Sequence, residues 1–468
     1  MSGDPVETVR EALRGSEAWV VGGTVRDELL QRPIRDVDLA VPGDPEPVAR
    51  AVAKAVSGPV FPLSEAFGAW RAIDRRQGFV CDVSPLQGAT IEQDLSRRDF
   101  TVNAMAVPLA GGELIDPHGG RRDLGDRVLR VVSERAYEHD PLRPLRLARL
   151  SAELGLRPEP ATEELTRKAA PRVTEASPER IYAELRRLMV SDGVLAGLEL
   201  ADRTGVLGAV LPEVAELHGV EQSHFHHLDV YEHTMEVLAQ ALELEGRLDE
   251  LFGHLAPRLR AVLDEPLADE LTRREAIRFG ALLHDIGKPR TRGVLENGRV
   301  TFIGHDSVGQ EMVLALCRRL RTSERLARFV AGLTKHHLVL GFLVHQRPLP
   351  ARTVYHYLRH TSPVEVEVTL LSCADRLATR GKNAEAAIAA HLDLARELMA
   401  AALDWRATGP PSPPIRGDEL ARELGIEQGP ELGVLLGELA EAVFAGEATT
   451  RQQAVEVARR LRENREQR

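Results

Sequence analysis

Hydrophobic and polar positions follow two different patterns along this chain. In the first 130 residues, apolar residues form short runs or alternate with polar ones, which is typical of strands separated by short helices. The strands are predicted at 18–22, 34–41, 69–74 and 79–84. The helices are predicted at 45–56 and 91–106. This mixture predicts an α+β head, built on a small mixed sheet and ending near residue 130.

From about residue 140 onward, apolar residues recur almost entirely at spacings of three and four. That periodicity predicts helices, and prolines separate several of them. The clearest examples are 142–154, 179–190 and 192–203. The run GPPSPP at 409–414 predicts a linker before a short helical tail. The remainder of the chain is therefore expected to be all-α.

Composition narrows the class of protein. The chain has 468 residues, too many for one core, and three widely spaced cysteines with no CxxC pair. This excludes a disulfide framework and a cysteine-rich zinc site, and it favours a reducing compartment. Neither an apolar signal core nor a membrane-length run of ~18 apolar residues occurs. We therefore expect a cytoplasmic protein with no membrane partner.

The net charge of −11 argues against broad nucleic-acid binding, because phosphate contacts need positive side chains. Local distribution can outweigh the total. Arginines are concentrated at 121–149 and 180–187, so these segments are the candidates for binding phosphates.

Two carboxylates, Asp36 and Asp38, lie two residues apart in the predicted strand RDVDLA. Residues two apart on a strand face the same side, and neighbouring carboxylates repel unless a cation lies between them. Magnesium prefers oxygen ligands, so the pair could hold Mg²⁺. Gly22 and Gly23 precede a predicted helix, where the backbone could approach a phosphate closely. For an Asp-x-Asp pair alone, acids on a solvated strand are the alternative.

Taken together, the motifs resemble those of the polymerase-β-type nucleotidyltransferases, in particular bacterial class II tRNA CCA-adding enzymes and poly(A) polymerases. The stretch VVGGTVRDELL, followed by RDVDLAV, is similar to the catalytic signature of that family. Further motifs occur in the family's order: RRDFTVNAMA, IDPHGGRRDL, EHDPLRPLRLARL and SPERIYAEL. The resemblance covers roughly residues 18–215.

This resemblance implies roles for individual residues. Asp36 and Asp38 would ligate Mg²⁺, and Asp82 would supply a third catalytic carboxylate. The implied nucleotide-binding residues are Gly22, Gly23, Arg26, Arg97, Arg98, Asp99, Asn103, Asp140, Arg143, Arg146 and Arg149. The implied reaction is untemplated addition of nucleotides from CTP and ATP to the tRNA 3′ end, by two-metal phosphoryl transfer that releases pyrophosphate.

Asp140 and Arg143 would select the base. Asp accepts hydrogen bonds and Arg donates them, and cytosine and adenine both present an amine donor beside a ring-nitrogen acceptor. Guanine and uracil present the reverse order and would leave polar groups unpaired. The family has Glu before this Asp, whereas this chain has His139, so no role is carried over to that position. The alternative is structural: Asp140 caps a helix, and Arg143 and Arg149 lie on a solvated face.

The segment between Asp82 and Arg97, VSPLQGATIEQDLS, is shorter than the flexible loop of full CCA-adding members of the family. A shortened loop resembles the CC-adding members, which need a separate A-adding enzyme to complete the tRNA end. CC addition is therefore expected, with CCA addition and A addition or poly(A) synthesis as the alternatives.

A second constellation of candidate ligands has the order H…HD…D, which resembles the metal site of an HD domain. The motif HDIGKP contains its central His-Asp pair. The expected ligands are His233, His284, Asp285, His305, His336 and Asp375, with His337 as the alternative to His336. Imidazole and carboxylate ligands suit a second divalent transition metal, with magnesium as the alternative. Three nearby histidines, His224, His226 and His227, are expected to be loop residues.

The expected organisation has four parts. These are a nucleotidyltransferase head at 1–130, a helical base-selecting and RNA-binding neck at 131–215, an HD-type helical domain at 216–385, and a helical tail with its Pro-rich linker at 386–468. An HD-domain phosphohydrolase, either a phosphatase or a cyclic phosphodiesterase, stays open as the main or a second activity. A non-catalytic RNA-binding protein would have lost acidic motif residues, and none of those matched is lost.

Overall fold

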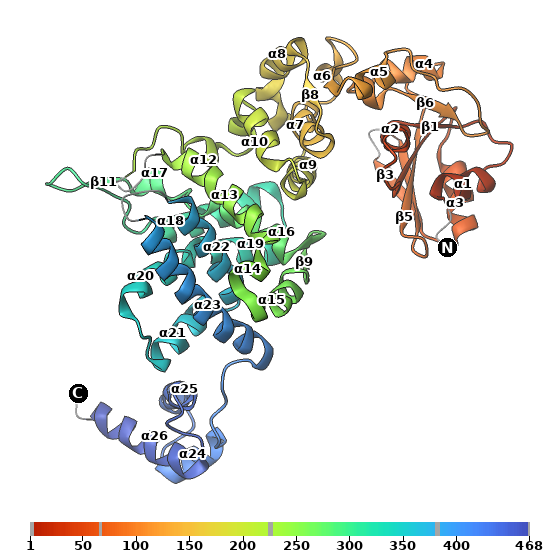
Figure 1. The fold of residues 1–468 in the computed structure, drawn as a ribbon. Helices are drawn as coiled ribbons and strands as arrows, with labels where there is room; N and C mark the ends of the chain where they lie inside the picture. The colour runs from red at the N-terminus through yellow and green to blue at the C-terminus, as the bar shows by residue number, and fades with distance from the viewer. Residues whose placement is uncertain (1–3, 65–67, 223–227, 380–383, 467–468) are drawn as a thin grey trace. The chain divides into compact units, whose positions relative to one another are not determined.

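The computed structural model describes residues 4–64, 68–222, 228–379 and 384–466. The chain divides into two compact units, Met1–Val210 and Leu211–Arg468 (Figure 1). His224, His226 and His227 lie outside the described residues. Among the helices of the described ranges, none is both long and apolar enough to cross a membrane.

The first unit contains a six-stranded mixed sheet with the order β3-β4-β5-β2-β1-β6. Its strands are β1 (Trp19–Val21), β2 (Asp36–Val41), β3 (Val60–Ser64), β4 (Ala69–Asp74), β5 (Phe79–Pro85) and β6 (Ala106–Pro108). Strands β2 and β5 run parallel, and the other neighbours run antiparallel. The edge strand β3 was not predicted, because Pro62 interrupts its pattern and the side chains of residues 61–63 are exposed.

Alternation along β2 separates the two faces of this sheet. Val37, Leu39 and Val41 are buried in the main core, together with residues of α1 (Pro5–Ala12) and α3 (Glu46–Val56). Both helices lie on one side of the sheet (Figure 1). Since successive side chains on a strand point to opposite faces, packing of the valines and Leu39 places Asp36 and Asp38 on the other face.

The predicted helix at 91–106 is wrong over most of its length. Helix α4 spans only Ile91–Leu95, a short 3₁₀ turn follows at Thr101–Asn103, and β6 begins at Ala106. The reason is tertiary pairing: the backbone at Asp99 and Thr101 exchanges hydrogen bonds with residues 130 and 132. These bonds hold the RRD motif in an extended bend, so tertiary contacts override the helical spacing.

The rest of the first unit is helical. Its elements are α2 (Gly23–Leu29), α5 (Gly120–Gly125), α6 (Ala136–His139), α7 (Arg143–Leu154), α8 (Pro160–Ala169), α9 (Pro178–Val190), α10 (Val194–Arg203) and α11 (Val206–Val210), with a small β7 (Val128–Leu129) and β8 (Arg157–Pro158) pair. Helices α7, α9 and α10 match the helices expected at 142–154, 179–190 and 192–203. Helix α7 packs against both α9 and α10.

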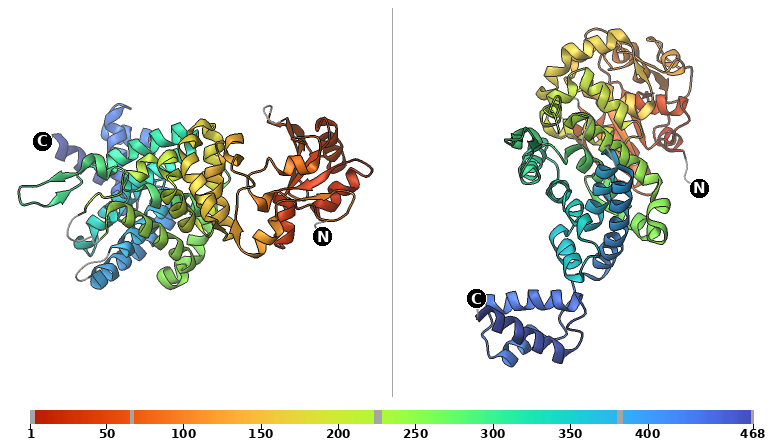
Figure 2. Two further views of the ribbon diagram at one scale, coloured as in Figure 1. Left: turned by 90° about the horizontal axis from the view of Figure 1, so that it is seen from above. Right: turned by 60° about the vertical axis from the view of Figure 1, so that its left-hand side comes forward.

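The second unit is a helical assembly, as Figure 2 shows. Its longer helices are α13 (Val230–Gly246), α16 (Arg273–Leu283), α18 (His305–Leu320), α19 (Glu324–His336), α21 (Ala351–Thr361), α22 (Glu365–Ala378) and α23 (Ala384–Thr408). Shorter elements between them include α12 (Pro212–Ala215), α14 (Leu248–Phe252), α15 (Ala256–Leu263), α17 (Lys288–Thr291), α20 (Val339–Leu343) and two small hairpins, β9 (Pro266–Ala268) with β10 (Leu271–Thr272) and β11 (Gly293–Val294) with β12 (Val300–Thr301). The tail, α24 (Gly417–Leu424), α25 (Pro430–Phe444) and α26 (Arg451–Glu466), has its own apolar cluster. A mixed-sheet head followed by helical domains is therefore confirmed.

Candidate functional site

Three carboxylates meet on the open face of the head sheet. Asp36 and Asp38 lie on that face of β2, and the parallel register places Asp82 of β5 directly beside Asp38. All three line one pocket. The strand geometry thus brings Asp82 to the pair that the sequence alone had identified.

Their electrostatics fit a divalent cation. Burial, together with the negative charge of Asp82, raises the pKa of Asp38 to about 6. Burial also raises the pKa of Asp36. Crowded carboxylates resist ionisation unless a positive charge lies among them, and oxygen-only ligands suit Mg²⁺. The residues present therefore fit the ion that the motif implies.

A tight turn lies against Asp38. Gly22, between β1 and α2, has a φ of 64°, and a Cβ there would lie 2.7 Å from Nη1 of Arg98 and 3.7 Å from Oδ2 of Asp38. A larger residue would displace the Arg98 guanidinium. Arg26, on α2, is buried, and its guanidinium bonds the side chains of Asp27 and Asn103. Glycine at position 22 therefore leaves room for the Arg98 guanidinium beside the Asp38 carboxylate.

The pocket has a volume of about 680 Å³, and every nucleotide-site residue predicted from the motifs lines it. These residues are Gly22, Gly23, Arg26, Asp36, Asp38, Asp82, Arg97, Arg98, Asp99, Asn103, Asp140, Arg143, Arg146 and Arg149. Ser84, Gln87, Asp94, Glu184 and Arg187 also line it and were not predicted. Glu184 lies in the SPERIYAEL motif, to which no residue role was assigned, and the fold brings all five residues to the pocket.

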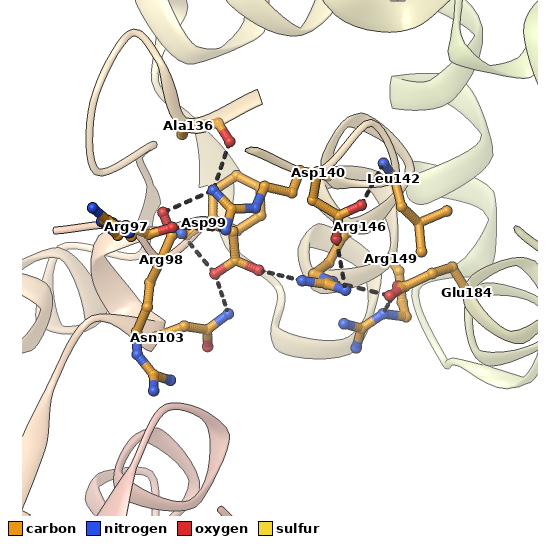
Figure 3. A network of polar contacts seen from close by, with 12 residues as sticks. Arg97, Arg98, Asp99, Asn103, Ala136, Asp140, Leu142, Arg146, Arg149 and Glu184 are labelled. Atoms are coloured by element: carbon orange, nitrogen blue, oxygen red, sulfur yellow. Dashed lines mark hydrogen bonds and ion pairs between the residues drawn. The ribbon is translucent and has the colours of Figure 1, made fainter. Parts of the chain in front are cut away.

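A buried ion-pair network joins the RRD motif to the helices α7 and α9 (Figure 3). Arg146 donates to Asp99 over 2.9 Å and to Glu184 over 2.9 Å, and Arg149 pairs with Glu184 and Glu153. Although burial opposes it, Arg146 and Arg149 lower the pKa of Glu184 to about 2. Arg146 and Arg149 are thus held by carboxylates of the protein itself, and Arg149 is buried rather than on a solvated face.

The predicted base-selecting pair is also held by the protein. Asp140 accepts from the backbone N–H of Leu142 over 3.1 Å and from Nη2 of Arg180 over 2.6 Å. Arg143 donates to the backbone carbonyls of Arg97, Arg98 and Ala136. Asp140 therefore bonds the backbone just before α7 without capping the helix, while Arg143 ties α7 to the RRD bend at the wall of the pocket.

The second unit gathers histidines and carboxylates from five helices. Ligand atoms of His233, His284 and Asp375 lie within 4.8 Å of one another, and those of Asp285, His305 and His337 form a second such group. The contributing helices are α13, α16 with the turn after it, α18, α19 and α22. All but Asp375 are buried. Residues up to 142 positions apart in sequence are thereby brought together, as the His233–Asp375 hydrogen bond illustrates.

Hydrogen bonds fix the orientation of three of these imidazoles. Nδ1 of His284, His305 and His337 contacts the backbone carbonyl three residues earlier, over 2.8, 2.6 and 2.7 Å. Because a carbonyl oxygen only accepts, Nδ1 carries the hydrogen and the lone pair of Nε2 faces the cluster. Burial lowers the pKa of His337 to about 4, which keeps that ring neutral.

Buried polar atoms in the cluster lack hydrogen bonds of good geometry, namely Nε2 of His284 and both carboxylate oxygens of Asp285. Lys288 Nζ lies 2.6 Å from one of those oxygens and supplies positive charge. Buried polar atoms are normally satisfied, so oriented but unsatisfied acceptors fit a divalent metal of the kind that imidazole and carboxylate bind.

The choice of His336 over His337 is corrected by this geometry. His337 lies in the cluster, whereas the ring of His336 packs against His360, with ring centroids 4.7 Å apart. Neighbouring residues of a helix point about 100° apart, so only one of the two can face a given centre. The periodicity of this short helix end gave no means of choosing between them.

Family models match three segments of the chain. A poly A polymerase head domain matches residues 18–130, a "probable RNA and SrmB-binding site of polymerase A" matches 155–217, and an HD domain matches 230–380. The carboxylates of the pocket lie within the first of these segments, the pocket residues at 139–149 lie between the first and the second, and the histidine cluster lies within the third. Fold and sites together define a nucleotidyltransferase that carries an HD domain.

Full-length relatives narrow this class. The chain is 38% identical to the A-adding tRNA nucleotidyltransferase of Deinococcus radiodurans over 93% of its own length and 94% of the relative's. It is 34% identical to the CC-adding tRNA nucleotidyltransferase of Thermus thermophilus, over 94% and 92%. The protein belongs to the tRNA nucleotidyltransferase family that includes the CCA-adding enzymes.

Solved structures share its fold. The Thermotoga maritima CCA-adding enzyme complexed with tRNA matches with a TM-score of 0.61 and 21% identity, over 98% of this chain and 96% of that one. A CCA-adding enzyme complexed with ATP matches with a TM-score of 0.63 and 20% identity, over 96% and 94%.

Proposed function

We propose that this chain adds cytidines from CTP to the 3′ end of tRNA without a nucleic-acid template. The observation that carries the proposal is the meeting of Asp36, Asp38 and Asp82 in one pocket with the arginines of the RRD motif. A carboxylate cluster beside fixed guanidinium groups suits a magnesium-bound nucleoside triphosphate.

In the proposed reaction, the tRNA 3′ oxygen forms a bond to the α-phosphorus, the bond to the β-phosphate breaks, and pyrophosphate leaves. Asp36, Asp38 and Asp82 would hold one or two Mg²⁺ ions, which would stabilise charge on the attacking and leaving oxygens. Arg98, beside Gly22, would bind the triphosphate. The Asp99–Arg146–Glu184 network holds the RRD bend against α7 and α9, so these groups would be in position before the nucleotide binds.

Asp140 and Arg143 would select the base through acceptor and donor groups. Arg180 and the N–H of Leu142 take two of the acceptor sites of the Asp140 carboxylate. A carboxylate has about four such sites, so others are left for the exocyclic amine of cytosine or adenine. The contacts of Arg143 with backbone carbonyls hold its guanidinium at the pocket wall, where it would donate to the base.

Addition of two cytidines is favoured by the connection between β5 and α4. Strand β5 ends at Pro85 and α4 begins at Ile91, so no long loop separates the acidic strand from the RRD motif. Relatives with CC-adding and A-adding names both align over nearly the whole chain. A CC-adding enzyme would depend on a separate A-adding partner.

Product length tests this proposal. The protein is incubated with Mg²⁺, tRNA that lacks its 3′-terminal CCA, and CTP, ATP or both. Two added cytidines and no adenosine are expected with both nucleotides present. Three added residues would indicate CCA addition, one adenosine on a tRNA that already ends in CC would indicate A addition, and a long A tract would indicate poly(A) synthesis. No extension of any tRNA would overturn the assignment.

The histidine cluster supports a second activity, hydrolysis of a phosphate ester by the HD domain. The observation that favours it is the oriented but unsatisfied set of His284 and Asp285 atoms. Metal analysis of the purified protein, followed by hydrolysis assays with a phosphomonoester and a 2′,3′-cyclic nucleotide, tests it. Absence of both bound metal and hydrolysis after metal addition would reject this activity while leaving nucleotide addition untouched.

A further inference from the structure

A row of side chains on the open face of the head sheet extends beyond the carboxylates. By register, Phe61 of β3 lies opposite Arg71 of β4, Arg71 lies opposite Asp82 of β5, and Asp82 lies beside Asp38 of β2. Directly opposite residues on neighbouring strands share a face. The four side chains therefore follow one line across the sheet.

Arg71 is anchored at the centre of this row. Its Nε donates to one oxygen of Asp82 and its Nη2 to the other, each over 2.7 Å. A guanidinium has five N–H donors, so those on Nη1 and one on Nη2 can still donate to a phosphate oxygen. The pair also offsets negative charge that would repel RNA at this edge of the carboxylate cluster.

Phe61 supplies an aromatic surface at the outer end of the row. It is 40% exposed, although aromatic residues make up only 4% of the chain. A large exposed aromatic beside an arginine is the combination on which a nucleobase stacks while its phosphate is bound.

The row also has a direction relative to the triphosphate. Gly22 and Arg98 lie on the β1 side of Asp38, whereas β5, β4 and β3 follow on the opposite side. In phosphoryl transfer, the attacking and leaving oxygens lie roughly in line. If pyrophosphate leaves toward Arg98, the attacking hydroxyl has to arrive from the side of Arg71.

We propose that Phe61 and Arg71 bind the 3′-terminal nucleotide of the RNA substrate, Phe61 by stacking on its base and Arg71 by donating to its phosphate. This inference rests on the proposed nucleotidyltransferase function. It gives the RNA end a binding place distinct from the nucleotide pocket, since neither residue lines that pocket.

Separate measurement of RNA and nucleotide binding tests the proposal. Phe61→Ala is expected to raise the KM for tRNA by about 5- to 150-fold, the range for loss of one base–aromatic stack, without changing the Kd for CTP. Phe61→Trp should restore the KM. Arg71→Ala should raise the KM in the same direction and reduce the salt dependence of tRNA binding by about one phosphate contact, and Arg71→Lys should recover part of the loss.

Strand β4, which carries Arg71, offers a matched control on its opposite face. Arg50 of α3 lies over the ring of Trp70, 5.4 Å from its centroid, so it forms a similar cation–aromatic pair that the proposal does not use. Arg50→Ala should leave the KM for tRNA unchanged. A Phe61→Ala protein that adds nucleotides with the wild-type KM for tRNA would overturn the proposal.

Cross-linking provides a readout that does not depend on folding of the Arg71 variants. A tRNA whose last nucleotide is 4-thiouridine should cross-link to the peptide covering 60–74 in the wild-type protein, and Phe61→Ala should abolish that product. Cross-links to other segments alone would also overturn the proposal. Wild-type protein that adds no nucleotide to any tRNA would instead reject the underlying function.

Discussion

The carboxylate pocket of the first unit and the histidine cluster of the second differ in how their charges are balanced. In the pocket, Arg146 forms ion pairs with Asp99 and Glu184. The carboxylates of Asp36 and Asp38 instead lie close to other carboxylates, which together with burial raises the pKa of Asp38. In the cluster, five helices supply the ligands, and Nζ of Lys288 lies 2.6 Å from an oxygen of Asp285. The pocket therefore pairs its outer acids with several arginines, whereas the cluster leaves Nε2 of His284 without a hydrogen-bond partner.

The two sites also differ in their openness. The pocket lies on an exposed sheet face and has about 680 Å³ for a nucleotide. The cluster is buried, with His284 and Asp285 at 0% and 1% exposure. This contrast predicts exchangeable Mg²⁺ at the first site and tightly bound metal at the second. The two sites should therefore respond independently to mutation.

The largest expected effect is loss of nucleotide addition in Asp36→Ala. Removing one of the two carboxylates from β2 should reduce extension of tRNA by about 10³-fold or more, because charge stabilisation at the reacting phosphate is lost. Primer extension on denaturing gels measures the rate. The metal content of the HD domain should stay at the wild-type level. Loss of metal from both sites in this variant would contradict their independence.

Asp285→Asn should impair the HD domain and spare the addition of nucleotides. The substitution removes a charged ligand from the buried cluster, so the metal found in the purified protein should fall at least tenfold, with loss of any phosphate-ester hydrolysis. Extension of tRNA should stay within about twofold of the wild type, because this residue belongs to the second unit and does not line the pocket. Inductively coupled plasma mass spectrometry and the extension assay are run on the same preparation. A loss of extension would show that the assignment of the two sites is wrong.

The residues of the pocket could be predicted from the sequence more accurately than the secondary structure around the pocket. Asp36 and Asp38 follow from strand alternation, and the predicted carboxylates and nucleotide-binding residues all line one pocket. The prediction of one helix over 91–106 was wrong because the backbone hydrogen bonds at Asp99 and Thr101 are made with residues some thirty positions away, and periodicity does not detect such partners.

Other features depended on tertiary structure in the same way. Arg71 lies in a segment without distinctive spacing, and Glu184 lies in a motif to which no site role was assigned; strand register and helix packing bring them to the site. In the HD domain, the order of the histidines and carboxylates identified most of the cluster, but it could not separate His336 from His337.

A smaller effect is expected on base selection. Asp140→Asn replaces an acceptor-only group with one that also donates, so the enzyme should discriminate less well between cytosine and uracil. The ratio of kcat/KM for CTP to that for UTP is expected to fall by about 5- to 150-fold, since one unpaired buried polar group costs about 1–3 kcal/mol. Glu138→Gln, an exposed neighbour outside the pocket, is the control and should keep the ratio. An unchanged ratio in Asp140→Asn would transfer base selection to other residues.

The smallest expected effect concerns pH, and it sharpens the contrast between the sites. Without metal, the folded protein raises the pKa of Asp38 from 3.8 to about 6, so the folded state binds this proton more tightly than the unfolded state. Its contribution to stability is present at low pH and is lost as the pH rises through about 6. Metal binding needs the ionised carboxylate of Asp38, so protons compete with the metal below that pH.

A Mn²⁺ titration tests this competition. In an Asp285→Asn background, which removes the metal of the HD domain, Mn²⁺ binding measured by electron paramagnetic resonance should weaken by about tenfold per pH unit below 6. Asp38→Asn should abolish this dependence, and a Mn²⁺ affinity that is constant between pH 5 and 7 would show that Asp38 does not ligate the metal.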